Sequence, residues 1–176
     1  TPSATLRDVY LAATRIAMRC VVILFAEARS LLPRDNAIYD ASYGLGSLRD
    51  QLDRTHRDRR TEGRGAWPRL MALFRLVALG SPHEALPVPA YGGKLFAPGN
   101  ATDPDPVMRV LAAMEGLGNT PSDAELWTIF TYLTQTRVRV RQGRGARTVP
   151  AAVDFSDLSS EFIGILYEGL LDFELH

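Results

Sequence analysis

The sequence predicts a mainly α-helical fold: a single irregular domain of about six helices with one small β-hairpin and a long loop rich in proline and glycine. Apolar residues recur at helical spacing in most segments, and capping residues or prolines mark the segment ends. Only residues 137–141 alternate like a strand. With 176 residues, 46% of them apolar, the chain can bury a core as one domain over residues 1–176. In order, we predict a helix over 4–32, a loop over 33–46, helices over about 47–60 and 67–80, an irregular loop over 80–104, helices over about 105–115 and 120–136, a hairpin over 137–149 and a helix over 159–172.

Local signals in the first half justify three helices. Residues 4–32 keep apolar side chains at helical spacing, and Pro33 ends the segment because proline cannot continue a helix. Ser47 is a suitable cap for the polar helix that follows. Trp67-Pro68 opens a short, strongly apolar helix, since proline is favoured in the first turn, and Gly80 ends it.

The second half begins with the long loop, in which residues 91–96 are the one segment expected to be extended. Residues 120–123 (TPSD) form a capping box that starts the next helix. Residues 137–141 and 147–149 can pair across the turn at 142–145. In the last helix either Ser156 or Ser159 can act as the cap, and five residues form an apolar stripe: Phe162, Ile163, Leu166, Leu170 and Leu171.

Charge and cysteine content limit the classes of function. The formal net charge is zero, which argues against strong autonomous binding to nucleic acid. The single cysteine, Cys20, lies in an apolar stretch and is expected in the core; it excludes an internal disulfide and a cysteine-based zinc site. We expect a cytoplasmic protein without a membrane partner, because the longest hydrophobic run is short and flanked by Arg19 and Glu27. The chain starts at Thr1, from which we expect a piece of a longer protein.

Catalytic motifs are missing from the sequence. Lys94 follows a glycine but precedes Leu95, so no P-loop is formed. The chain has neither a nuclease carboxylate–lysine set nor a glycine-rich cofactor loop, and residues 103–106 (DPDP) resemble a methylase catalytic loop only superficially. The three histidines are scattered, and the acidic residues of the last helix are typical of a solvated helix start. We therefore predict no catalytic, cofactor-binding or metal-binding residues in this chain.

The best candidates for nucleic-acid contact are the arginines of the hairpin. They occur within eleven residues that contain no acid, in a chain that is otherwise balanced in charge. The same pattern also fits a charged edge strand that avoids aggregation, so both interpretations stay open. The candidates are Arg137, Arg139, Arg141, Arg144 and Arg147.

Four blocks, in order, resemble segments of adenine-N6 DNA methylases of the single-chain type II restriction–modification and phage-defence type. They are RCVVILFAEARSLLP at 19–33, WPRLMALF at 67–74, AYGGKLFAP at 90–98 and VDFSDLSSEFIGILYEGLLDFEL at 153–175. Ala28 and Ser30 depart from the acidic residue and the glycine that the family usually has there, so that helix end is assigned no catalytic role.

The resemblance implies a helical connector between an N-terminal portion and the methylase domain of the same chain. Such a connector would position the methylase domain and contact the DNA backbone, while S-adenosylmethionine would serve the parent enzyme and not this fragment. The resemblance also implies that Glu27 and Arg29 form a buried or half-buried pair. The alternative is a protein-interaction or scaffolding module without nucleic-acid contact. Weak, salt-sensitive DNA binding is expected of the connector and not of the scaffolding module, so it distinguishes the two.

Overall fold

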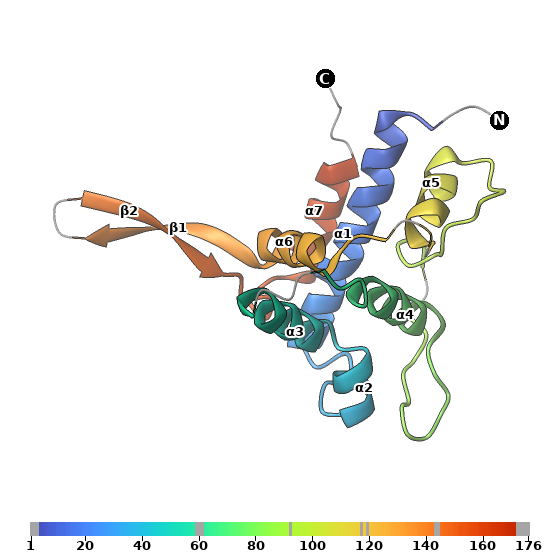
Figure 1. Ribbon diagram of the computed structural model, residues 1–176, viewed down its shortest axis with the longest axis horizontal. Coiled ribbons are helices and arrows are strands. Elements are labelled where there is room, and N and C mark those ends of the chain that lie inside the picture. The colour runs from blue at the N-terminus through green and yellow to red at the C-terminus, as the bar shows by residue number, and fades with distance from the viewer. Residues whose placement is uncertain are drawn as a thin grey trace.

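A computed structural model describes residues 4–58, 62–91, 93–116, 118, 120–142 and 145–171, and it confirms the mainly helical fold with one small antiparallel hairpin. Figure 1 shows the helices gathered around α1 and the hairpin projecting to one side. The elements are α1 (Leu6–Ala28), α2 (Ala37–Ser42), α3 (Leu45–Arg57), α4 (Ala66–Leu79), α5 (Pro106–Glu115), α6 (Asp123–Thr134), β1 (Gln135–Gln142), β2 (Gly145–Ala152) and α7 (Ser160–Leu171).

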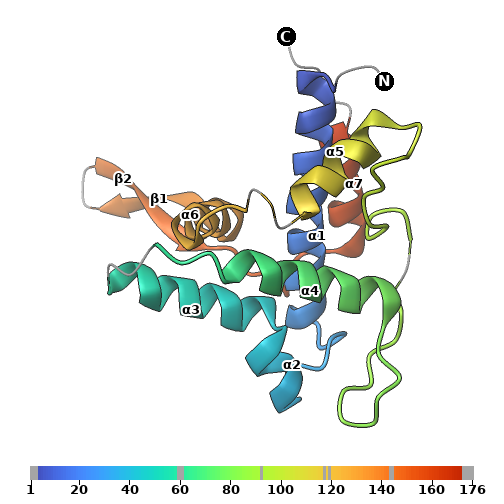
Figure 2. The same cartoon turned by 45° about the vertical axis from the view of Figure 1, so that its right-hand side comes forward.

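The long helix α1 is the centre of the molecule. It packs against α5 and α7 along its length and against α3 near its end, as the two ribbon views agree (Figures 1 and 2). Thr5 caps it through a capping box with Asp8. By length and hydropathy alone α1 could cross a membrane, yet its inner half is buried in this core, including Met18, Cys20 and Ile23. That packing accounts for its apolar composition.

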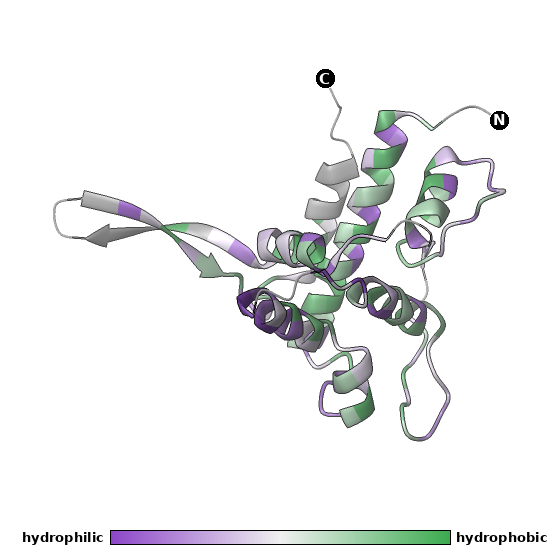
Figure 3. Ribbon diagram, in the orientation of Figure 1, coloured by the Kyte–Doolittle hydropathy of each residue, from purple (hydrophilic) through white to green (hydrophobic). Residues whose placement is uncertain are grey.

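The core lies between α1, α3, α4 and α6. Helix α3 contributes Leu45, Leu48 and Leu52, while its other side is polar, and Figure 3 shows hydrophilic residues concentrated along this helix. Helix α4 buries most of its apolar residues, as its sequence predicted. Helix α6 adds Leu126 and Phe130. Burial of these large side chains is the main source of stability for a domain of this size.

Helix boundaries differ from prediction in several places, and α1 ends at Ala28 and not at 32. Helix α2 lies within the predicted loop at 33–46, with Asn36 as its cap and Tyr39 fully buried. Helix α3 begins at Leu45, because its start is capped from another helix and not by Ser47. Helix α6 begins at Asp123 with Ser122 as its cap, so the predicted cap at Thr120 was wrong.

The long loop between α4 and α5 is irregular, as expected, but the described residues 93–96 of the segment expected to be extended are not. The chain forms turns over 93–96, where Gly93 has φ 89°, and the carbonyl of Leu95 is bound by Arg19. A β-bridge in this loop joins Ser81 and Val88 instead. Gly80 makes this possible, since its φ is 70° and an added Cβ would lie 2.6 Å from the carbonyl oxygen of Val88.

Candidate nucleic-acid interface

The hairpin is an arm that projects from the helical body, as Figure 1 shows on its left side. Helix α6 passes directly into β1, and β2 leads back to Phe155, which is buried in the core. At the base of the arm, the amide of Val153 donates to the carbonyl of Thr134 at 2.8 Å. Both ends of the arm are therefore attached to the core, and its position relative to α6 is fixed.

The strand register assigns the arginines of the arm to two faces. Arg137, Arg139 and Arg141 occupy alternate positions of β1, opposite Pro150, Thr148 and Ala146 in turn. Arg147 pairs with Val140 instead, so its position belongs to the other face, and its side chain is exposed.

The structure describes only part of this candidate set. The side chains of Arg137, Arg139 and Arg141 lie outside the described part, and Arg144 lies outside the described residues altogether. Between Glu125 and Asp154 the chain carries five arginines and no acidic residue. The backbone therefore brings a purely basic segment onto one projecting arm, which is a suitable arrangement for contact with phosphates.

A groove separates α6 from the base of the arm. Its volume is about 530 Å³. Helix α6 supplies one wall with residues at helical spacing, among them Trp127, Thr131 and Tyr132, and β2 supplies the other with Thr148 and Pro150. The Tyr132 side chain is 79% exposed, the largest exposed fraction among the large hydrophobic side chains that the structure describes.

Trp127 is held in place at the edge of this groove. Its indole N–H donates to a carboxylate oxygen of Asp53 at 2.8 Å. Its ring stacks on the ring of His56, with centroids 3.5 Å apart and planes only 4° from parallel. Both partners come from α3, so the groove wall is fixed by contacts across two helices.

The buried carboxylate of Glu27 has a structural role. Its Oε1 accepts the Tyr39 hydroxyl at 2.9 Å and the Leu45 amide at 2.7 Å, while Oε2 accepts the Gly46 amide at 2.9 Å. Gly44 occupies the N-cap position of α3 and has no side chain to act as a cap, so Glu27 caps this helix from α1.

Glu27 does not pair with Arg29, contrary to the expectation from sequence. The Arg29 guanidinium donates to the carbonyl of Leu158 at 3.0 Å and lies 5.4 Å from the centre of the Phe25 ring. It therefore points toward the segment before α7, whereas Glu27 points toward α2 and α3. The two residues lie on different sides of the end of α1 because they are two positions apart on a helix.

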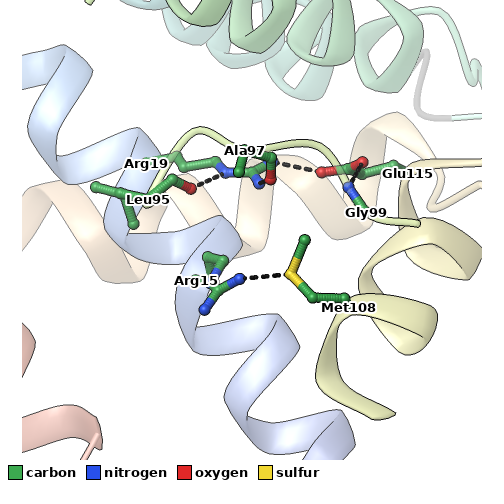
Figure 4. Close-up of polar contacts among 7 residues, drawn as sticks. All are labelled: Arg15, Arg19, Leu95, Ala97, Gly99, Met108 and Glu115. Atoms are coloured by element: carbon green, nitrogen blue, oxygen red, sulfur yellow. Dashed lines mark hydrogen bonds and ion pairs between the residues drawn. The ribbon is translucent and has the colours of Figure 1, made fainter. Parts of the chain in front are cut away.

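Arg19 is a buried cation whose donors are shared between the long loop and α5 (Figure 4). Its guanidinium donates to the carbonyls of Leu95 and Ala97, both at 2.8 Å, and forms an ion pair with Glu115 at 2.5 Å. The second oxygen of Glu115 accepts the Gly99 amide at 2.8 Å. This pair holds the loop against the helices, and each charge has a partner, as burial requires.

Asp123 caps another helix in the same way as Glu27. Helix α4 begins after Gly65, which has no side-chain cap, and the amide of Ala66 donates to Asp123 Oδ1 at 3.0 Å. A second hydrogen bond joins the two segments, since the Asp123 amide donates to the Gly63 carbonyl at 2.7 Å. Glu27, Glu115 and Asp123 are thus explained by packing and capping.

Over the described ranges, no three His, Cys, Asp or Glu side chains lie together as a metal site would require.

Sequence reasoning found the arm but missed the groove, because Trp127 and Tyr132 meet β2 only through the tertiary fold. The available signal was the outer stripe of α6, in which Thr128, Thr131 and Tyr132 follow helical spacing opposite Leu126 and Phe130. Comparison with protein-family models, curated proteins and solved structures finds no match to this chain.

Proposed function

We propose that this chain is a non-catalytic helical connector of an adenine-N6 DNA methylase of the restriction–modification or phage-defence type, which positions the methylase domain and contacts the DNA backbone. The observation that carries the proposal is the acid-free, arginine-rich arm on a well-packed helical body. The four sequence blocks that resemble this family support it as well. Under this proposal S-adenosylmethionine and the catalytic residues belong to other domains of the parent chain.

Three of the four blocks coincide with packing features that a connector needs. The first block contains Arg19 and Glu27, which tie α1 to the long loop and to α3. The block at 67–74 is the buried face of α4, and the block at 90–98 is the loop held by Arg19. This agreement supports a structural role for the blocks, in a domain whose shape is kept by specific polar contacts.

The charge of the arm predicts weak binding to the DNA backbone. Two or three phosphate contacts give a dissociation constant on the order of 0.1 mM or weaker at physiological salt. Each lost contact lowers the slope of log K against log salt concentration by about 0.9 on a duplex. Sequence-specific reading would then come from other domains of the parent enzyme.

The test replaces Arg137, Arg139 and Arg141 together with Gln, which keeps length and polarity but removes three charges. We expect weaker duplex binding and a salt slope smaller by about 2 to 3. The matched control replaces Arg7, Arg54 and Arg57 with Gln, which makes the same charge change on α1 and α3. Equal effects of the two triple variants, or no effect of either, would show that the arm makes no specific backbone contact.

A scaffolding function is the second candidate, and α7 favours it. Phe162 is 48% exposed and Ile165 is 66% exposed, and an added Cβ at Gly164 would meet nothing within 4 Å. This apolar helix face has no partner within the described part of the chain, and a neighbouring domain can pack on such a face. Phe162→Ser with Ile165→Ser in the parent enzyme should then reduce methylation without changing the DNA affinity of this chain.

A further inference from the structure

We infer that the groove between α6 and the base of the arm binds an unpaired nucleotide of a DNA strand, with its base stacked on Tyr132. The inference rests on the proposed DNA contact and deepens it by naming the form of DNA. The arm would hold the phosphates on either side while the groove takes the base.

The first support is the exposed aromatic surface. Tyr132 is 79% exposed and lines the groove together with the fixed ring of Trp127. An aromatic ring in such a position has a strong preference for another flat, partly apolar surface, and nucleobases stack on tyrosine in proteins that bind single strands. A paired base inside a duplex does not present its face, so the ring selects an unpaired one.

The second support is the polar lining. Within the part of the chain that the structure describes, the side chains of Gln135, Thr136 and Thr148 make no hydrogen bond, although each lines the groove. Their amide and hydroxyl groups can both donate and accept, which suits the edge of a base or a sugar. The volume of about 530 Å³ lies within the usual range for sites that take a small ligand or a single nucleotide.

The third support is the charge around the groove. Its walls come from the segment between Glu125 and Asp154, in which all five charged residues are arginines, and the nearby Asp53 carboxylate already accepts a hydrogen bond from the Trp127 indole. A protein or peptide partner would require acidic residues to match this charge. A nucleic-acid strand supplies both the negative charge and the flat base, so it is the occupant that the groove fits best.

The experiment compares a labelled single strand of about 12 nucleotides, a length within the usual site size of such grooves, with its duplex. Fluorescence anisotropy measures the affinity of the whole chain for each. Tyr132→Ala should weaken single-strand binding on the order of ten-fold, whereas duplex binding should change less than about two-fold. Tyr132→Phe keeps the ring and should bind the single strand nearly as well as the wild type.

Ile129→Ala is the matched control, since Ile129 is an exposed apolar residue on the same helix that does not line the groove. Because Tyr132 is exposed, its replacement should leave the thermal unfolding midpoint unchanged, which separates lost stacking from lost folding. If Tyr132→Ala binds the single strand as the wild type does while the triple arginine variant does not bind, this inference fails and the proposed backbone contact stands. If the wild type binds neither strand form, both fail.

Discussion

The carboxylate of Glu27 accepts the amide of Leu45 at 2.7 Å, so the last turn of α1 provides the cap that the first turn of α3 lacks. A cap within one helix stabilises only that helix. A cap from a second helix also fixes how the two helices meet, because the amides point along the axis of α3. The side-chain hydroxyl of Tyr39 on α2 joins the same carboxylate. One buried group therefore sets the positions of three helices.

Replacing Glu27 by Ala should lower the free energy of unfolding by about 3 kcal/mol, because two amides and a hydroxyl lose their acceptor. Glu27→Gln keeps one carbonyl oxygen and should cost less. Urea denaturation followed by circular dichroism measures both. Glu84, an exposed glutamate in the long loop, provides the control, and Glu84→Ala should change stability by less than about 0.5 kcal/mol. Equal losses at the two sites would contradict the capping role.

The ion pair of Arg19 and Glu115 should show strong coupling in a double-mutant cycle. Arg19→Met leaves the Glu115 carboxylate without its cation and should cost about 3 to 5 kcal/mol, while adding Glu115→Gln should cost little more. The comparison pair is Arg49 and Asp50, which lie 3.6 Å apart with side chains 36% and 56% exposed. That pair should couple by no more than about 1 kcal/mol. If the losses of stability from the Arg19 and Glu115 substitutions add, the two side chains are not coupled and the ion pair does not hold the loop.

Gly99 should not tolerate a side chain. An added Cβ would lie 2.1 Å from the backbone nitrogen of Ala112, and the backbone of α5 cannot move away as a flexible side chain can. Gly99→Ala should therefore destabilise the fold by about 1 to 3 kcal/mol. Gly65 has nothing within 4 Å of such a Cβ, so Gly65→Ala should cost less, about 0.5 kcal/mol, because alanine is a poorer N-cap residue than glycine. Thermal unfolding of the two variants tests this contrast.

Stability should fall at alkaline pH through Tyr39. Burial, together with the charge and hydrogen bond of Glu27, raises the pKa of the Tyr39 hydroxyl above its ordinary value of 10.0. A group with a raised pKa in the folded state contributes its full stability below the unfolded pKa and loses it as pH rises further. The free energy of unfolding should thus decline above about pH 10. Tyr39→Phe should be less stable at neutral pH but decline less steeply; a profile parallel to that of the wild type would exclude Tyr39 as the cause.

Cys20 should be inert in the folded protein. Its side chain is 2% exposed, and burial raises the pKa of the thiol to about 12. Because the thiolate is the reactive form, a disulfide reagent at pH 8 should not label the native chain. The same reagent should titrate one thiol per chain in denaturant, since Cys20 is the only cysteine. Rapid labelling under native conditions would show that α1 opens locally.

Local signals predicted most helices but not the contacts between them. Gly80 ended α4 as expected, and Ser159 was one of the two caps proposed for α7, where its hydroxyl accepts the Phe162 amide at 3.0 Å. The start of α3 was misplaced because its cap is Glu27, which lies 18 residues earlier than Leu45 and can be recognised only in three dimensions. Helix α2 was missed because its six residues show too little periodicity to identify a helix.

The last helix departs from the sequence pattern in a way that burial explains. Phe162 and Ile163 were expected in one apolar stripe, but Ile163 is buried while Phe162 is 48% exposed. The side chains of Leu166, Leu170 and Leu171 lie outside the described part of the chain. Helix α7 packs against α1 with one face only. A residue next to Ile163 in sequence, such as Phe162, therefore points away from that face. The arginine arm was placed correctly as a hairpin, whereas its DNA contact remains a prediction.

The attachment of the arm at both ends has a mechanical consequence. A force applied to the hairpin divides between its two strands and reaches the body at Thr134, which ends α6, and at Phe155, which precedes α7. The antiparallel strands are paired over eight residue positions, so we expect the hairpin to bend as one unit. A load on the arm should therefore reach α6 and the segment that precedes α7 at the same time.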